Sequence, residues 1–263
     1  MRTARGSGCE GGDPPGGQWN SVAEPFTAQR RSAIEKIALK AGAKLVERNG
    51  WRQVESFTSP ESEMRAVREG AGISDLSPLT KIDLRARDSS AAWGMVFPGE
   101  EGPAGDRIRS APLCGQPVLA ARLNPGRIFF TAPPGWGQTM ETAVRKGASE
   151  AKVGVTDVTS GFSVIELAGP AAASVLRKLT PVEPPGEDQT LTEAQLGHVH
   201  AIIFRVDGLP EVGSEAIPAY RLHVQRDLGF YLWEVLEDAG REFALAPYGT
   251  EARSRLFPKV FSA

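Results

Sequence analysis

Residues with metal-binding or nucleophilic side chains are few in this chain of 263 residues. It has two cysteines, Cys9 and Cys114, and three histidines, His198, His200 and His223. His198 and His200 would share one face of a strand, but a metal site needs a third ligand nearby, and the spacing of these residues supplies none. We therefore predict no metal site and no disulfide framework, and we interpret the two histidines as a polar surface pair.

We predict structural rather than catalytic roles for two aspartates and one cysteine. Asp75 and Asp157 each precede an apolar residue and then a Ser or Thr. Aspartates in this setting accept hydrogen bonds from backbone N–H groups, so we predict that both cap turns. Cys114 has no basic neighbour to lower the pKa of its thiol, and we predict a buried structural thiol. The chain has no G-x-G-x-x-G motif after a strand, which argues against a dinucleotide site of its own.

Composition indicates an ordinary globular protein, with 41% hydrophobic residues, 24% charged residues and a net charge of −2. This charge gives no general attraction to nucleic acid or to an anionic membrane. No apolar run approaches the roughly 20 residues that span a bilayer. The arginines near the N-terminus are not followed by an apolar segment, so we predict no signal peptide and a cytoplasmic location.

Hydrophobic periodicity predicts a mixture of helices and strands. Residues 1–28 are rich in Gly and Pro, and we predict a disordered leader there. Helices are expected near residues 31–41, 60–70, 138–146, 170–180 and 227–240. Strands are expected at 81–87, 118–123, 127–131, 162–167, 199–206 and 219–225, with loops at 97–112 and 208–218 and a linker at 181–188.

Alternation within two of these strands predicts which side chains face the core. In residues 219–225, Tyr220, Leu222 and Val224 are predicted inward, and Arg221, His223 and Gln225 outward. In residues 81–87 the predicted outward set is Lys81, Asp83, Arg85 and Arg87. Tyr231 and Trp233 lie on the apolar stripe of the last long helix, so both are predicted to be core residues.

An internal repeat organises the chain. Residues 73–77 (ISDLS) resemble 155–159 (VTDVT), and 82–84 (IDL) resemble 165–167 (IEL). The repeat, near 73–93 and 155–176, has two copies only, so it is not a solenoid. It predicts two related α/β lobes around a shared central region.

The same residues carry a family resemblance. The stretch REGAGISDLS from Arg68, followed by Lys81-Ile82, is similar to the early motif of the aminomethyltransferases of glycine cleavage. LAGPAA from Leu167 resembles the second-lobe motif of that family, and GTEAR from Gly249 resembles its G-L-x-A-R. Within the superfamily, the segments from Thr156 and from Tyr220 are most similar to the gamma subunit of heterotetrameric sarcosine oxidase. The resemblance implies an α+β, duplicated two-lobe folate-binding domain over residues 29–258, with a tail at 259–263 and without the C-terminal barrel of the full transferases.

The resemblance also implies that the chemistry of the family is absent. In the transferases an aspartate of a G-G-φ-x-D-D strand acts on the folate-bound carbon; the matching residues 114–119 (CGQPVL) hold no carboxylate. A family glutamate accepts hydrogen bonds from the pterin, and Arg221, which has donors only, stands in its place. Asp106 is the nearest carboxylate, in a loop where we expect no catalysis. We therefore expect no catalytic residue.

Three functions follow as alternatives. The first is a non-catalytic gamma-type subunit docked to flavin-carrying oxidase subunits, with the apolar strand 199–206 contributing to the interface. The second is a tetrahydrofolate-dependent aminomethyltransferase or demethylase with relocated carboxylates, acting on a small methylated amine such as sarcosine or glycine. The third, an assembly factor of the iron–sulfur repair branch, ranks last because its K-G-C-φ-x-G-Q signature is absent.

The resemblance implies three candidate residues for a folate pocket, Tyr220, Arg221 and Arg253. Arg253 matches a family arginine that lies near the folate tail. We expect no firmly bound cofactor, and tetrahydrofolate is the ligand that the resemblance allows.

Overall fold

The computed structural model describes residues 29–150, 152–208 and 215–258. The predicted leader at 1–28 and the tail at 259–263 lie outside these residues. The helices are α1 (Glu35–Lys40), α2 (Pro60–Glu69), α3 (Ser89–Val96), α4 (Gly137–Gly147), α5 (Ala172–Arg177), α6 (Gly229–Gly240) and α7 (Thr250–Leu256). The strands are β1 (Lys44–Arg48), β2 (Trp51–Ser56), β3 (Gly72–Asp75), β4 (Thr80–Ala86), β5 (Ile108–Leu113), β6 (Gln116–Asn124), β7 (Arg127–Ala132), β8 (Val153–Asp157), β9 (Phe162–Ala168), β10 (Thr190–Leu196), β11 (Val199–Arg205), β12 (Ala219–Gln225) and β13 (Ala246–Pro247).

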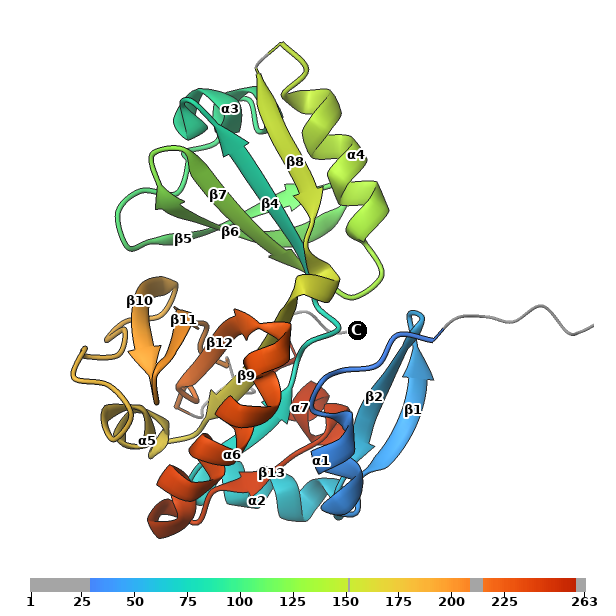
Figure 1. Cartoon of the computed structure of the whole chain (residues 1–263), viewed down its shortest axis with the longest axis vertical. Helices are drawn as coiled ribbons and strands as arrows, with labels where there is room; N and C mark the ends of the chain where they lie inside the picture. The colour runs from blue at the N-terminus through green and yellow to red at the C-terminus, as the bar shows by residue number, and fades with distance from the viewer. Residues whose placement is uncertain (1–28, 151, 209–214, 259–263) are drawn as a thin grey trace, which may run out of the picture.

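Two sheets form two lobes, one above the other in Figure 1, and the hairpin β1–β2 lies beside the lower lobe. The upper sheet has the strand order β5-β6-β7-β4-β8, and the lower sheet has the order β10-β11-β12-β9-β3-β13. Neighbouring strands are antiparallel except for the short parallel pair β13–β3. A bridge between Arg107 and Thr190 joins the edges of the two sheets. The chain is therefore an α+β protein with two linked antiparallel sheets.

Each lobe borrows a strand from the other half of the chain. The elements β3 to α4 follow the order ββαβββα, and the elements β8 to α6 repeat this order. However, β3 pairs with β9, whereas β8 pairs with β4. Each sheet thus needs both halves of the sequence.

Two segments cross between the lobes, residues 76–79 after β3 and residues 158–161 after β8, and these crossing segments have matching hydrogen bonds. The N–H of Leu76 donates to the carbonyl of Val164 at 2.8 Å, and the N–H of Val158 donates to the carbonyl of Lys81 at 2.9 Å. The hydroxyl of Ser77 accepts from the N–H of Val164, and that of Thr159 accepts from the N–H of Lys81. The two halves therefore meet in a nearly twofold arrangement.

Asp75 and Asp157 lie directly before the two crossing segments, and each accepts a hydrogen bond from a backbone N–H two residues later. The carboxylate of Asp75 accepts from the N–H of Ser77 at 2.9 Å, and that of Asp157 from the N–H of Thr159 at 2.8 Å. The prediction that both aspartates cap turns is confirmed. Their matching positions make the two chain reversals alike.

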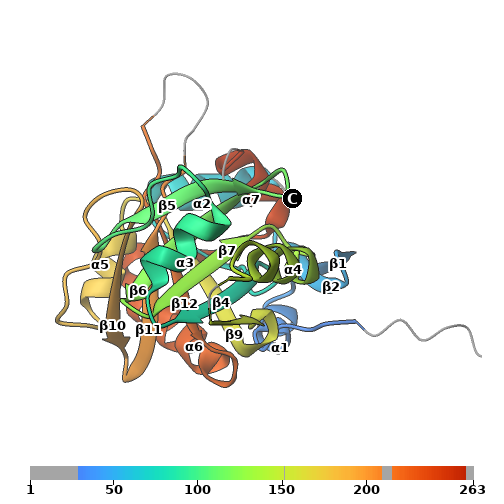
Figure 2. The same ribbon diagram turned by 90° about the horizontal axis from the view of Figure 1, so that it is seen from above.

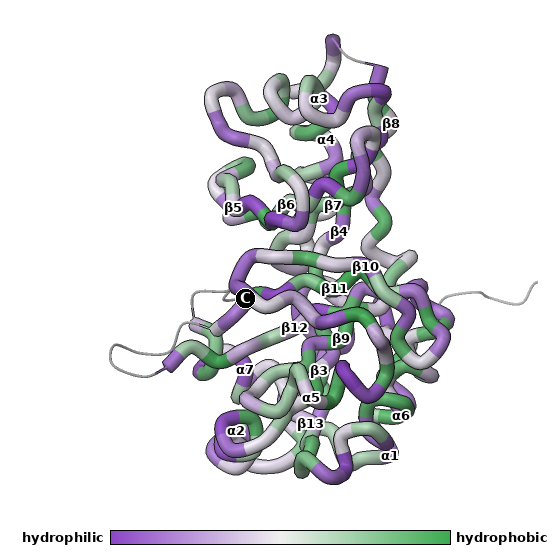
Figure 3. Tube along the Cα trace, turned by 90° about the vertical axis from the view of Figure 1, so that its left-hand side faces the viewer, coloured by the Kyte–Doolittle hydropathy of each residue, from purple (hydrophilic) through white to green (hydrophobic). Residues whose placement is uncertain are grey.

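Helices cover the outer faces of the sheets, and apolar side chains fill the space between the inner faces. Figure 2 shows α3 and α4 over the upper sheet, where Trp93 and Met140 join its core. Helices α5 and α6 pack on the lower sheet. A third cluster lies between the sheets and includes Leu119, Phe129 and Phe204. In contrast, α2 is largely hydrophilic in Figure 3, and its buried residues are Glu63 and Val67.

Local sequence explains the element boundaries. The Ser59 hydroxyl caps α2 ahead of Pro60, and Asp88 caps α3. Gly169 ends β9 with φ of 113°, and a Cβ there would lie 2.4 Å from the carbonyl oxygen of Val67. Only glycine allows this close approach of the two backbones. The turn at Asn124 also forms as predicted, joining β6 to β7.

Several expectations were wrong. The predicted loop 97–112 contains most of β5, and β1, β2 and β10 were not predicted. Cys114 is exposed, because it occupies a tight β5–β6 turn with φ of 52°. Tyr231 is 42% exposed, while Trp233 is buried as expected. Strand β11 lies between β10 and β12 and is buried apart from His200 and the partly exposed Arg205, so residues 199–206 form no apolar surface for an interface.

Candidate functional site

A buried carboxylate, Glu166, is the centre of the polar cluster that includes two of the candidate residues. Its Oε1 accepts from Arg253 Nε at 2.7 Å and from the Tyr248 hydroxyl at 2.8 Å. Its Oε2 accepts from Arg253 Nη2 at 3.0 Å and from Arg221 Nε at 3.4 Å. Glu166 is 1% exposed and Arg221 0%. We call these four residues the Glu166 cluster.

Three elements, and the residue that follows a fourth, position the cluster. Glu166 on β9 lies opposite Arg221 on β12 in the antiparallel register. Arg253 comes from α7, and Tyr248 follows β13 at the edge of the same sheet. Arg221 and His223 were predicted to point outward, and this was wrong. The inner face of β12 is covered by α7 and by the upper lobe, so both of its faces are buried.

The electrostatic interactions within the Glu166 cluster favour the ionised forms of Glu166 and of its arginine partners. Burial opposes ionisation of Glu166, but the two guanidinium groups outweigh it and hold the pKa of this carboxyl below its usual value. Burial also lowers the pKa of Arg221 to about 10, so this guanidinium stays protonated at neutral pH. Burial and the nearby carboxylate raise the pKa of Tyr248 well above its usual value. The cluster is thus a buried ion pair with a neutral tyrosine donor.

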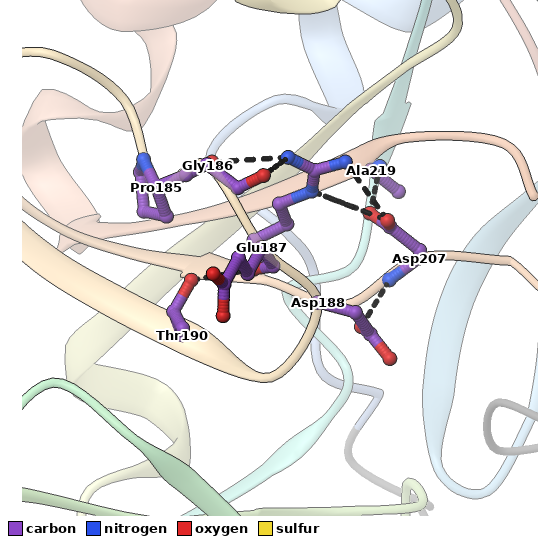
Figure 4. Close-up of polar contacts among 8 residues, drawn as sticks. Pro185, Gly186, Glu187, Asp188, Thr190, Asp207 and Ala219 are labelled. Carbon is purple, nitrogen blue, oxygen red and sulfur yellow. Dashed lines mark hydrogen bonds and ion pairs between the residues drawn. The ribbon is translucent and has the colours of Figure 1, made fainter.

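Tyr220, the third candidate residue, lies elsewhere. Its ring packs on the helix-covered face of β12, opposite to Arg221, and the guanidinium of Arg205 lies over it at 5.7 Å. Arg205 also forms a bidentate pair with Asp207 and donates to the carbonyls of Pro185 and Gly186 (Figure 4). The structure therefore brings Arg221 and Arg253 together and leaves Tyr220 in a separate network.

The stretch that matches the family's catalytic strand is apolar where it is buried. Residues 114–119 form the turn between β5 and β6 and the start of β6. Leu119 is 7% exposed and lies in the cluster between the sheets, next to Phe129. Asp106, the nearest carboxylate in sequence, has a side chain that is 73% exposed and lies 4.0 Å from Arg107. The absence of a carboxylate in this stretch is thus a feature of an apolar interior.

Two further titratable groups are buried between the lobes. Lys81, predicted to be outward, is 0% exposed, and its Nζ donates to the carbonyls of Ser77 at 2.7 Å and Phe162 at 3.2 Å. Burial lowers the pKa of this amine to about 7. Burial lowers the pKa of His223 to about 3, while its Nδ1 lies 3.2 Å from the Ile202 carbonyl. Asp83 was also predicted outward but is buried, because it pairs with Arg127 on β7 at 2.7 Å.

Sequence reasoning missed Glu166, Tyr248 and the buried state of Lys81. A signal existed for Glu166, since it is the charged residue within the otherwise apolar strand FSVIELA. A charge in such a strand indicates a buried partner. Within the described part of the chain, no group of three or more His, Cys, Asp or Glu side chains could hold a metal ion. None of the described helices is long and apolar enough to cross a membrane.

The two lobes with exchanged strands define the class of fold. Residues 34–257 match the GCVT N-terminal domain family, and the chain belongs to this family. Among curated relatives, an aminomethyltransferase of Moorella thermoacetica is 28% identical over 82% of this chain and 60% of its own length. The sarcosine oxidase subunit alpha of Rhizobium meliloti is 24% identical over 88% of this chain and 25% of its own length. The chain thus spans less than two thirds of the aminomethyltransferases it matches.

Solved structures agree on the fold. The glycine cleavage aminomethyltransferase T of Bartonella henselae superposes with a TM-score of 0.73 at 21% identity, over 86% of this chain and 61% of that one. A chain of the heterotetrameric sarcosine oxidase of Corynebacterium sp. U-96 superposes with a TM-score of 0.54 at 18% identity, over 71% of this chain and 96% of that one. The predicted fold class is confirmed.

Proposed function

We propose that this chain serves in one-carbon metabolism as a protein of the aminomethyltransferase type, in the handling of a small methylated amine such as sarcosine or glycine. Two forms of the proposal differ in whether the chain itself carries out a transfer. The transferase form requires a catalytic carboxylate between the lobes, and the subunit form does not.

The first form is a tetrahydrofolate-dependent aminomethyltransferase or demethylase. The names of the relatives favour this form over a non-catalytic subunit, since aminomethyltransferases align over more than four fifths of this chain. This form requires a carboxylate outside residues 114–119 to act on the reacting carbon. Glu166 is poorly suited to that role, because both of its oxygens already accept hydrogen bonds from buried donors.

The second form is a non-catalytic gamma-type subunit, docked to flavin-carrying subunits of a sarcosine-oxidase-like complex. The geometry of the site supports this form best. The observation that carries it is the pairing of Arg221 with Glu166, which puts a donor-only side chain where the family has an acceptor and uses the nearby carboxylate to neutralise it. A chain of the heterotetrameric sarcosine oxidase superposes over 96% of its length, which supports the comparison with a subunit of such a complex.

Calorimetric titration of the purified chain with tetrahydrofolate separates the two forms. The subunit form predicts weak or absent binding, and co-purification of the tagged chain with a flavoprotein in a fixed ratio, detected by flavin absorbance. Low-micromolar binding that is lost in Arg253→Ala but kept in Arg255→Ala would instead contradict the subunit form. Arg255 is the matched control, because it lies on the same helix and pairs with Glu61 and Glu251 at the surface.

A further inference from the structure

A small pocket lies beside the Glu166 cluster, where the hairpin β1–β2, helix α7 and the crossing segment after β3 meet. Its polar lining includes Asp75, Arg48, Arg253 and Thr250, and its apolar lining includes Leu76 and Leu79. We call it the Asp75 pocket. A carboxyl group and two guanidinium groups therefore line one pocket together with apolar side chains.

The size of the Asp75 pocket limits its occupant. The cavity volume is about 70 Å³. This volume is several times the roughly 10–15 Å³ that a cavity needs to hold one water molecule, so the pocket has room for a small polar molecule. Glycine and sarcosine are molecules of this size, whereas a pterin ring system is larger. Drug-sized ligands occupy roughly 300–1,000 Å³.

The charges of the pocket fit a zwitterion. Asp75 accepts from the N–H of Ser77, and burial raises the pKa of its carboxyl although the hydroxyls of Ser32 and Ser77 and the charge of Lys81 act in the opposite direction; an ammonium group in the pocket would favour the ionised carboxylate further. Arg48 is half exposed and lies 3.7 Å from Glu55, a distance that leaves this pair weak. A guanidinium group binds a carboxylate through parallel hydrogen bonds.

A buried hydroxyl adds a third contact. Thr250 Oγ1 is shielded from solvent and has no hydrogen-bond partner among the described residues. A buried hydroxyl without a partner carries a cost that a polar ligand would remove. Arg253, whose guanidinium is turned to Glu166, adds positive potential on the same side.

We propose that the Asp75 pocket binds a small zwitterionic amino acid, with its amino group at Asp75 and its carboxylate at Arg48. N-methyl groups would pack on Leu76 and Leu79. The choice of glycine and sarcosine as ligands rests on the proposed function, but the pocket does not depend on whether the chain transfers a one-carbon unit. Co-purification with a flavoprotein and amino-acid binding can therefore succeed or fail separately.

Calorimetry of the full chain with sarcosine and with glycine tests the proposal. We expect saturable binding of at least one of them, with acetate and methylamine each at least about tenfold weaker because each offers only half of the contacts. Asp75→Asn and Arg48→Met should each weaken binding about tenfold or more. Asparagine keeps an acceptor for the turn at Ser77, and Arg48 lies on an exposed hairpin, so neither substitution removes a core contact.

Lys44→Met is the matched control, because Lys44 lies on the same strand as Arg48 and also pairs with Glu55, but does not line the pocket. The affinity of Lys44→Met for the amino acid should equal that of the unchanged protein. The absence of saturable binding at millimolar amino acid would overturn the proposal. So would binding that acetate matches, or binding that Arg48→Met leaves unchanged.

Discussion

Glu166 is held by three side chains from separate parts of the chain, and its negative charge is shared between two buried guanidinium groups. Removing one partner of a buried pair leaves the other charge uncompensated, which costs about 3–5 kcal/mol. We expect Glu166→Gln to lower the free energy of unfolding by about this amount, measured by urea denaturation. Glu183→Gln, which breaks an exposed pair with Arg177, should have little effect. A loss of less than about 1 kcal/mol for Glu166→Gln would show that the cluster is not a buried ion pair.

His223 is a second residue whose charge state is set by burial. Its ring lies 4.6 Å from that of Phe204 and 5.5 Å from that of Phe129, between the lobes. Its pKa is about 3 in the folded protein against 6.5 for an ordinary histidine, so the unfolded chain binds more protons between these values. The free energy of unfolding therefore falls as the pH decreases from about 6.5 toward 3.

We expect His223→Leu to reduce this loss of stability in acid, because the variant has no imidazole to protonate in the unfolded state. Urea denaturation at several pH values between 7 and 4 would measure it. The same substitution at His200, whose side chain is 58% exposed, is the surface control, because it removes no imidazole from between the lobes. An identical acid profile for His223→Leu and the unchanged protein would contradict the buried neutral imidazole.

At the scale of elements, Lys81 joins the two crossing segments through its amine as well as its backbone. The pKa of the amine is about 7 in the folded protein against 10.5 for an ordinary lysine. The unfolded chain therefore binds more protons between these values, and the free energy of unfolding rises as the pH increases from about 7 toward 9. We expect this rise to be smaller in Lys81→Met and preserved in Lys36→Met, where the lysine is exposed on α1. Hydrogen–deuterium exchange or urea denaturation across this pH range would test it; equal slopes would contradict the prediction.

Most long elements could be predicted from the sequence, because their periodicity or turn residues are local. Strand 219–225 and helix 60–70 are found nearly where the pattern placed them. The exposure of side chains could not be predicted in the same way. Alternation separates the two faces of a strand, but Arg221, His223 and Lys81 lie on faces that distant segments cover.

The candidate site shows the same limit. Arg221 and Arg253 could be proposed from the family resemblance, yet their shared partner Glu166 depends on the register of β9 and β12 and on the docking of α7. Strands β1, β2 and β10 carry too many polar residues for a clear periodic signal, and β5 is interrupted by Pro112. Tertiary contacts decided these elements.

At the scale of the whole molecule, the exchange of β3 and β8 makes the two lobes interdependent. The upper sheet takes β8 from the second half, and the lower sheet takes β3 from the first. We expect fragments cut at residue 151 to be largely unfolded when separate and to recover structure when mixed, by circular dichroism. The intact chain should unfold in a single cooperative transition. A native-like spectrum from either fragment alone would contradict this expectation.

The internal duplication itself stays a proposal, which the repeated element order and the matching crossing segments support. The symmetry is broken at one position with a chemical consequence. Lys81 of the first crossing corresponds to Val164 of the second, so only the first provides a buried amine. If both halves descend from one ancestral half, the two crossing segments came to differ in charge when their sequences diverged after the duplication.

The paired crossings also determine how the lobes can move. Segments 76–79 and 158–161 run between the lobes side by side, bound to each other's flanking strands. A further connection joins the sheet edges at the bridge between Arg107 and Thr190, where the N–H groups of Ile108 and Leu191 donate to the carbonyls of Gln189 and Asp106, both at 2.8 Å. Rotation of the lobes about the line that joins the two crossing segments would have to break these bonds before the apolar cluster around Phe129 and Phe204 became exposed, while the Glu166 cluster would move with the lower lobe and α7.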